Sequence, residues 1–189
     1  MIVGDPTIFA IESIITEAYE RLSFLALGLF VIHVGGRCYG VYKPDATMLA
    51  CSFGEVEERI AHRGRHTAPF ADELDAGKIA DAVRHAIFAD EPDDQYFGIP
   101  REEFREMFYT QSVDRMWAPD GDEAFDDGSY VLHFDVEDRV RLIAFQCQES
   151  IPHSHGTLRV GWHDPDGCAE GRGGFSPAGQ SVAGQSGNA

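Results

Sequence analysis

The sequence lacks the short motifs that mark common catalytic sites. It contains no GxSxG, no GxGxxG, no P-loop and no Cys/His signature of an activated nucleophile. Enzymes can also assemble an acid/base pair from residues far apart in the chain, so this absence lowers the expectation of catalysis without removing it. We therefore expect a binding protein rather than an enzyme, with no catalytic residues and no cofactor.

Closely spaced cysteines and long apolar runs are also missing. No CxxC pair occurs, which argues against a zinc knuckle and a thioredoxin-type motif. The N-terminus has no basic segment of the kind found in secretory signals. The most apolar stretch, Phe24–Val34, is too short to span a bilayer. These absences predict a cytoplasmic protein whose four cysteines are free thiols, namely Cys38, Cys51, Cys147 and Cys168.

Basic residues are few. The chain of 189 residues has 15 Lys and Arg against 32 Asp and Glu, which gives a net charge of −17. No basic cluster suited to a nucleic acid or to an anionic membrane is present, so we expect neither as a partner. The acidity favours a basic protein partner, and solubility alone is the alternative explanation.

Apolar residues make up 43% of the chain, which is enough for a core. Their spacing predicts an α+β fold, a single domain whose antiparallel sheet packs against two or three helices. Residues 1–48 are expected to be largely extended, and two hairpins supply the sheet. The N-terminal hairpin has arms Phe24–Val34 and Arg37–Tyr42 around Gly35-Gly36, and the C-terminal hairpin has arms Tyr130–Phe134 and Val140–Phe145 around a polar turn, Asp135–Arg139.

Three segments have apolar residues at helical spacing. The first is 53–63, with Ser52 as its N-terminal cap. The second is Phe70–Phe88, in which Leu74 starts an apolar face that continues through Ile79 and Val83. The third is the short segment Arg101–Tyr109.

The negative charge is concentrated between Asp72 and Asp127, where 17 acidic and 5 basic residues give a net charge of −12. Two acidic runs dominate this region, and large aromatic residues are interleaved with them. Carboxylates that steer a partner and aromatic groups that anchor it are typical of a surface that docks onto a basic protein. The predicted partner-binding residues are Asp90, Glu91, Asp93, Asp94, Trp117, Asp120, Asp122, Glu123, Asp126 and Asp127. The alternative is a solvated acidic face with Trp117 in the core.

Two groups of histidines resemble metal sites without matching one. His62 and His66 are four residues apart, but a glycine lies between them and no HExxH motif is present, so we expect surface histidines. His153 and His155, with His163, lie in a segment that is predicted to be a polar loop.

One acidic loop resembles a calcium site. Counting from Asp120, the fifth and sixth positions are Ala124 and Phe125, where a calcium loop needs an oxygen ligand and a glycine. The loop therefore does not match, and we expect no bound metal anywhere in the chain.

Two sequence blocks, far apart in the chain, are recognisable as a pair. The first is Met1–Pro6 followed by Phe9–Ile11, and the second is Tyr130–Leu132 continuing through Val140–Ala144. Together with their spacing, they resemble the immunity protein 42 family of bacterial polymorphic toxin and contact-dependent inhibition systems, over residues 1–156. The resemblance implies an intracellular antitoxin that binds a cognate toxin domain stoichiometrically and blocks its active or substrate-binding surface. A nuclease toxin suits the charge, because a cleft that binds phosphates is basic.

The end of the chain departs from the family pattern after Arg159. The resemblance implies that family members continue there into a further amphipathic helical segment. Residues 164–189 are instead rich in Gly, Ser, Gln and Ala. We expect a domain over 1–163 and a disordered tail over 164–189, and a shifted reading frame would explain the tail.

Two other functions are open at this point. One is a small metal-dependent hydrolase that uses His153 and His155, and the other is a general acidic module for protein interactions. A metal assay on the purified protein separates the hydrolase from the two binding functions.

The tail composition predicts the effect of a truncation. Residues 164–189 have almost nothing to bury, so removing them after His163 should leave the melting temperature nearly unchanged. Calorimetry of both chains measures this. A fall of more than a few degrees, or protection of residues 171–187 from proteases, would contradict the assignment.

Overall fold

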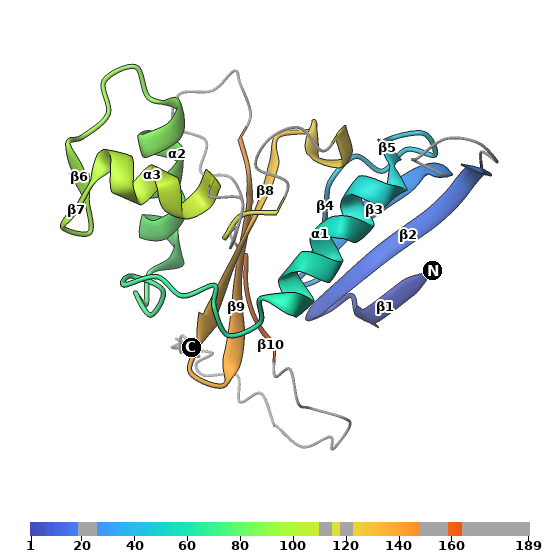
Figure 1. Cartoon of the computed structure of the whole chain (residues 1–189), viewed down its shortest axis with the longest axis horizontal. Helices are drawn as coiled ribbons and strands as arrows, with labels where there is room; N and C mark the ends of the chain where they lie inside the picture. Colours follow the sequence, from blue (N-terminus) through green and yellow to red (C-terminus); the bar gives the residue numbers. More distant parts are fainter. Residues whose placement is uncertain (19–25, 110–114, 118–122, 148–158, 164–189) are drawn as a thin grey trace, which may run out of the picture.

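A computed structural model of the whole chain shows an α+β fold with antiparallel sheets, as expected (Figure 1). The structure describes residues 1–18, 26–109, 115–117, 123–147 and 159–163, the last five by their backbone alone. The predicted tail, 164–189, lies outside the described residues. None of the helices in the described ranges is long and apolar enough to cross a membrane.

The N-terminal third of the chain forms one antiparallel sheet. Its strands run in the order β1 (Ile2–Asp5), β2 (Phe9–Ala18), β3 (Ala26–Val34) and β4 (Arg37–Tyr39), and the short β5 (Thr47–Met48) also pairs with β3. The predicted hairpin at Gly35-Gly36 is confirmed, since Val34 pairs with Arg37 and both glycines have positive φ, 57° and 80°. Such a turn matches the twist of the two strands it joins.

A second sheet has the order β10–β9–β8. Its strands are β8 (Ser129–Val136), β9 (Arg139–Gln146) and β10 (Arg159–His163). The C-terminal hairpin is therefore confirmed, with a tighter turn than predicted. Asp135 pairs with Val140, and Val136 pairs with Arg139. Residues predicted to form the turn therefore belong to the two strands, and the turn itself has only two residues.

The first helix begins earlier than its sequence pattern indicates. It is α1 (Leu49–Ala61), not 53–63, and Ser52 is a buried residue inside it rather than its cap. The reason is that α1 follows β5 directly, and its first residue, Leu49, is buried in the core that includes Phe30 of β3.

The second helix begins later than predicted. It is α2 (Ala76–Phe88), and Asp75 caps it by accepting a hydrogen bond of 2.9 Å from the amide of Gly77. Leu74 therefore precedes the helix and is 95% exposed, so its assignment to the apolar face was wrong. The third helix, α3 (Arg101–Tyr109), agrees with the prediction. Two short strands, β6 (Gln95–Tyr96) and β7 (Ile99–Pro100), join α2 to α3.

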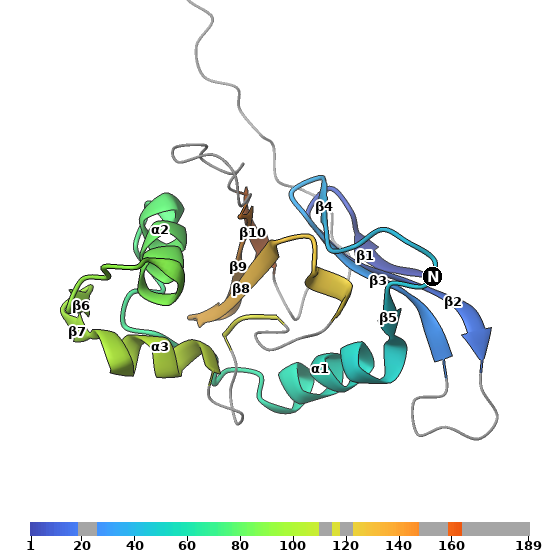
Figure 2. The same ribbon diagram turned by 90° about the horizontal axis from the view of Figure 1, so that it is seen from above.

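The β8–β9 hairpin lies between two hydrophobic clusters. Alternate side chains of a strand point to opposite faces, and here both faces are apolar. Leu132 and Ile143 pack with α2 and α3, whereas Val131 and Leu142 pack with the N-terminal sheet and α1. Figure 2 shows α2 and α3 on one side of β8 and β9, and α1 with the first sheet on the other.

A matched pair of substitutions tests this arrangement. Leu132 is fully buried, so Leu132→Ala should lower the free energy of unfolding by about 2–5 kcal/mol. Leu74→Ala removes the same atoms from an exposed position and should change it by about 0.5 kcal/mol or less. Urea denaturation of both variants measures the difference, and equal losses would contradict the placement of Leu74 outside the core.

Candidate functional site

The first acidic run lies on the loop between α2 and β6. All four of its carboxylates, those of Asp90, Glu91, Asp93 and Asp94, are exposed. The loop itself is well anchored, because the hydroxyl of Tyr96 accepts a 3.0 Å hydrogen bond from the amide of Asp93, and the carbonyl of Asp94 accepts one of 2.9 Å from Arg101. These contacts anchor the backbone of the loop at Asp93 and Asp94.

The second acidic run lies around the short 3-10 helix η1 (Glu123–Phe125). Asp120 and Asp122 lie outside the described residues, whereas Glu123, Asp126 and Asp127 are exposed. Asp127 has a structural task, since its carboxylate accepts hydrogen bonds from the amide and hydroxyl of Ser129 at 3.0 and 2.9 Å. Glu123 and Asp126 border a shallow hollow beside Lys43.

The structure does not bring the first run together with the described residues of the second run, Glu123, Asp126 and Asp127. The first lies beyond α2 and α3, and η1 lies across the β8–β9 hairpin from them, on the side of α1 and β5 (Figures 1 and 2). With the runs apart, a partner that covers one of them need not touch the other.

Trp117 belongs to the core. Its side chain is 5% exposed and packs in the cluster that contains Phe30 and Val131. The guanidinium carbon of Arg59 lies 4.4 Å from the centre of the indole ring, a cation–π contact. This burial favours the interpretation that Trp117 is a core residue over the interpretation that it is an exposed anchor for a partner.

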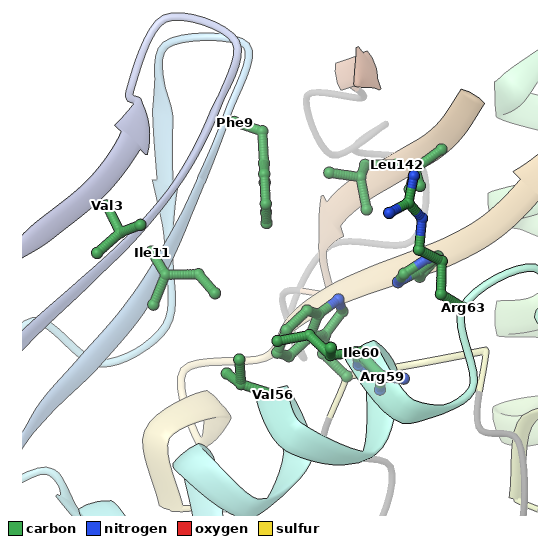
Figure 3. Close-up of a pocket in the computed structure, with 11 residues that line it drawn as sticks. Val3, Phe9, Ile11, Val56, Arg59, Ile60, Arg63 and Leu142 are labelled. Atoms are coloured by element: carbon green, nitrogen blue, oxygen red, sulfur yellow. The ribbon is translucent and has the colours of Figure 1, made fainter. Parts of the chain in front are cut away.

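An apolar hollow of about 350 Å³ separates α1 from the first sheet. Figure 3 shows Val3 and Ile11 on the sheet side, facing Val56 and Ile60 of α1, and Leu142 of β9 at the far end. Trp117 and His133 complete the inner wall, and Arg59 and Arg63 also line it.

Three polar residues form a buried cluster next to this hollow. His66 is 1% exposed, and its Nδ1 lies 2.9 Å from Oδ2 of Asp135. The ring of His133 stacks on that of His66 with 4.4 Å between centres, and its Nε2 lies 3.7 Å from Oδ1 of Asp135. Among the described residues, neither buried ring nitrogen of His133 has a hydrogen-bond partner.

Burial and neighbouring charges affect the pKa values of His133 and Asp135 in different ways. Burial lowers the pKa of His133, and nearby His66 and Arg59 lower it further against the influence of Asp135. For Asp135, burial acts to raise the pKa, but the interactions with His133 and His66 outweigh burial and hold the pKa well below its usual range. The cluster therefore holds a carboxylate next to a neutral imidazole.

The sequence did not predict this cluster. The expectation that His66 is a surface histidine was wrong, because α1 ends at Ala61 and the following segment turns His66 inward against β8. His62, which stays at the surface, pairs with Glu58 instead. Only the alternation of β8, which places His133 and Asp135 on one face, signals part of the cluster in the sequence. His153 and His155 lie outside the described residues.

The burial of Trp117 leads to a test of its role. Trp117→Ala should lower the free energy of unfolding by about 3–5 kcal/mol, because it opens a cavity beside Phe30, and Trp117→Phe should cost less. Denaturant titration of both variants measures the losses. A Trp117→Ala variant that keeps its stability but loses its protein partner would instead make Trp117 an anchor.

Comparisons with known proteins agree with the resemblance seen in the sequence. The family model described as Immunity protein 42 matches residues 1–166. No curated protein matches the chain. Among solved structures, the chain is similar to CdiI from Burkholderia dolosa AUO158, with 15% identity, a TM-score of 0.49, and coverage of 86% of this chain and 90% of that one.

The family match extends beyond Arg159, where the sequence had suggested a departure, and includes the backbone of β10. It spans both recognisable blocks and every residue of the two acidic runs. The chain belongs to the immunity protein 42 family.

Proposed function

We propose that this protein neutralises a cognate bacterial toxin in the cytoplasm by stoichiometric binding and without catalysis. The observation that carries the proposal is the match of the immunity protein 42 model to residues 1–166. An inhibitor of this kind needs a stable surface complementary to the toxin. It does not need a reactive group, so the missing catalytic motifs are consistent with the proposal.

The charge of the chain supports a basic partner. A net charge of −17 accelerates the approach of a positively charged surface, and exposed carboxylates then limit the orientations in which it docks. A nuclease domain has such a surface, because its substrate-binding cleft must attract phosphates. We propose that this protein covers that cleft and so keeps the substrate out.

The two acidic runs are the surfaces that we propose for docking. The first run is anchored at Tyr96, and the described part of the second run is anchored at Ser129. Anchored groups lose little freedom on binding, which preserves more of the interaction energy for affinity. Because the first run and the described residues of the second lie on different sides of the β8–β9 hairpin, one of the runs carries the principal contact with a toxin of ordinary size.

Two charge variants identify the docking run. One carries Asp90→Asn, Glu91→Gln, Asp93→Asn and Asp94→Asn. The other carries Asp120→Asn, Asp122→Asn, Glu123→Gln and Asp126→Asn, and it spares Asp127 because Ser129 depends on that carboxylate. At low salt, the variant of the docking run should associate with the toxin about tenfold or more slowly, and added salt should shrink the difference. Stopped-flow mixing with the cognate toxin domain measures the rate.

A third variant controls for total charge. It carries Glu57→Gln, Glu58→Gln, Glu137→Gln and Asp138→Asn, four exposed positions outside both runs. All three variants change the net charge from −17 to −13, so only the position of the lost charge differs among them. If both run variants associate at the control's rate in low salt, the acidic runs serve solubility and the docking surface lies elsewhere.

A further inference from the structure

We propose that His66, His133 and Asp135 form a binding site for one divalent transition-metal ion, with Zn²⁺ as the best match to two imidazoles and a carboxylate. One ligand atom from each residue can be chosen so that all three lie within 4.8 Å of one another. This donor set is one that Zn²⁺ accepts, with a fourth position left for water. The proposal departs from the sequence-based expectation of no metal, which considered groups of histidines near one another in the chain and one acidic loop.

The distances within the cluster fit a shared ion. Nδ1 of His66 lies 2.9 Å from Oδ2 of Asp135, and Nε2 of His133 lies 3.7 Å from Oδ1. Two ligands of a tetrahedral zinc ion at 2.0–2.1 Å are about 3.3 Å apart. These two separations fall on either side of that value. The rings of His66 and His133, which stack with 4.4 Å between centres, would have to turn so that a nitrogen of each ring faces the ion.

His133 supplies the observation that points to a ligand. Both of its ring nitrogens are buried, and neither has a hydrogen-bond partner among the described residues. A buried polar group without a partner is unfavourable, and a metal ion would satisfy one nitrogen directly. His133 also lines the hollow beneath α1, which offers the ion a route from solvent and space for a water ligand.

The backbone holds the ligands in place before any ion binds. The amide of His66 donates to Oδ2 of Asp135 at 2.8 Å, and the amide of Asp135 donates to the carbonyl of His66 at 3.0 Å. The amide of His133 donates to the carbonyl of Arg115 at 2.8 Å. These bonds join the segment after α1 to β8, so an ion at this point would strengthen an existing junction rather than create one.

The local charges allow a cation. The carboxylate of Asp135 offsets one of the two charges of Zn²⁺. The nearby guanidinium of Arg59 is held by the carbonyl of Met116 at 2.6 Å and by the ring of Trp117.

Titration of the full-length protein tests the proposal. After treatment with a chelator, the protein should bind one equivalent of Zn²⁺ at micromolar concentration in a calorimeter, and its melting temperature should rise by several degrees. Co²⁺ should give the intense visible absorption of a tetrahedral site. A wild-type protein that binds no ion saturably at these concentrations overturns the proposal, and this result needs no variant.

Four variants locate the ion. His133→Gln should abolish binding, and His133→Cys, which restores a ligand, should recover it. His62→Gln removes a surface histidine four residues from His66 and should bind as the wild type does. A double variant, His153→Gln with His155→Gln, should also retain one equivalent. Zinc retained by His133→Gln, or lost from the double variant, would place the ion elsewhere and overturn the assignment.

Discussion

The apolar packing on both faces of the β8–β9 hairpin holds the two halves of this molecule together. Leu132 and Ile143 bury one face against α2 and α3, and Val131 and Leu142 bury the other against the first sheet and α1. Burial of large aliphatic side chains is the main favourable term in folding. Both hydrophobic clusters include side chains of the hairpin, so each half completes its core against it.

Much of this fold could be predicted because its patterns are local. The Gly35-Gly36 turn, the α3 helix and the C-terminal hairpin follow from spacing and turn chemistry alone. The first residues of α1 and α2 could not be predicted from these local patterns. Packing of Leu49 beside β3 moves one start toward the N-terminus, and the cap at Asp75 moves the other toward the C-terminus. Both shifts depend on contacts that sequence periodicity does not contain.

For the candidate surfaces too, the sequence predicts local properties but not their arrangement in space. Exposed carboxylates could be identified from composition, since runs of like charge stay in solvent, but the sequence does not show on which side of the hairpin each run lies. The burial of Trp117 was equally undetermined, because a tryptophan suits both a core and an interface. The cluster of His66 and Asp135 brings together residues 69 positions apart, and only the tertiary fold makes them neighbours.

Buried polar groups explain how long irregular segments stay ordered around this hairpin. Arg141 of β9 is 2% exposed and donates to the carbonyls of Ala71 and Glu73, which holds the segment before α2. Arg59 holds the carbonyl of Met116 in a similar way. Charged donors form stronger hydrogen bonds than neutral ones, and a buried charge without partners would be very unfavourable. These two arginines therefore hold loop segments whose backbone lies outside the strands. Ordered loops lose little entropy when a partner binds, so more of the interaction energy remains for affinity.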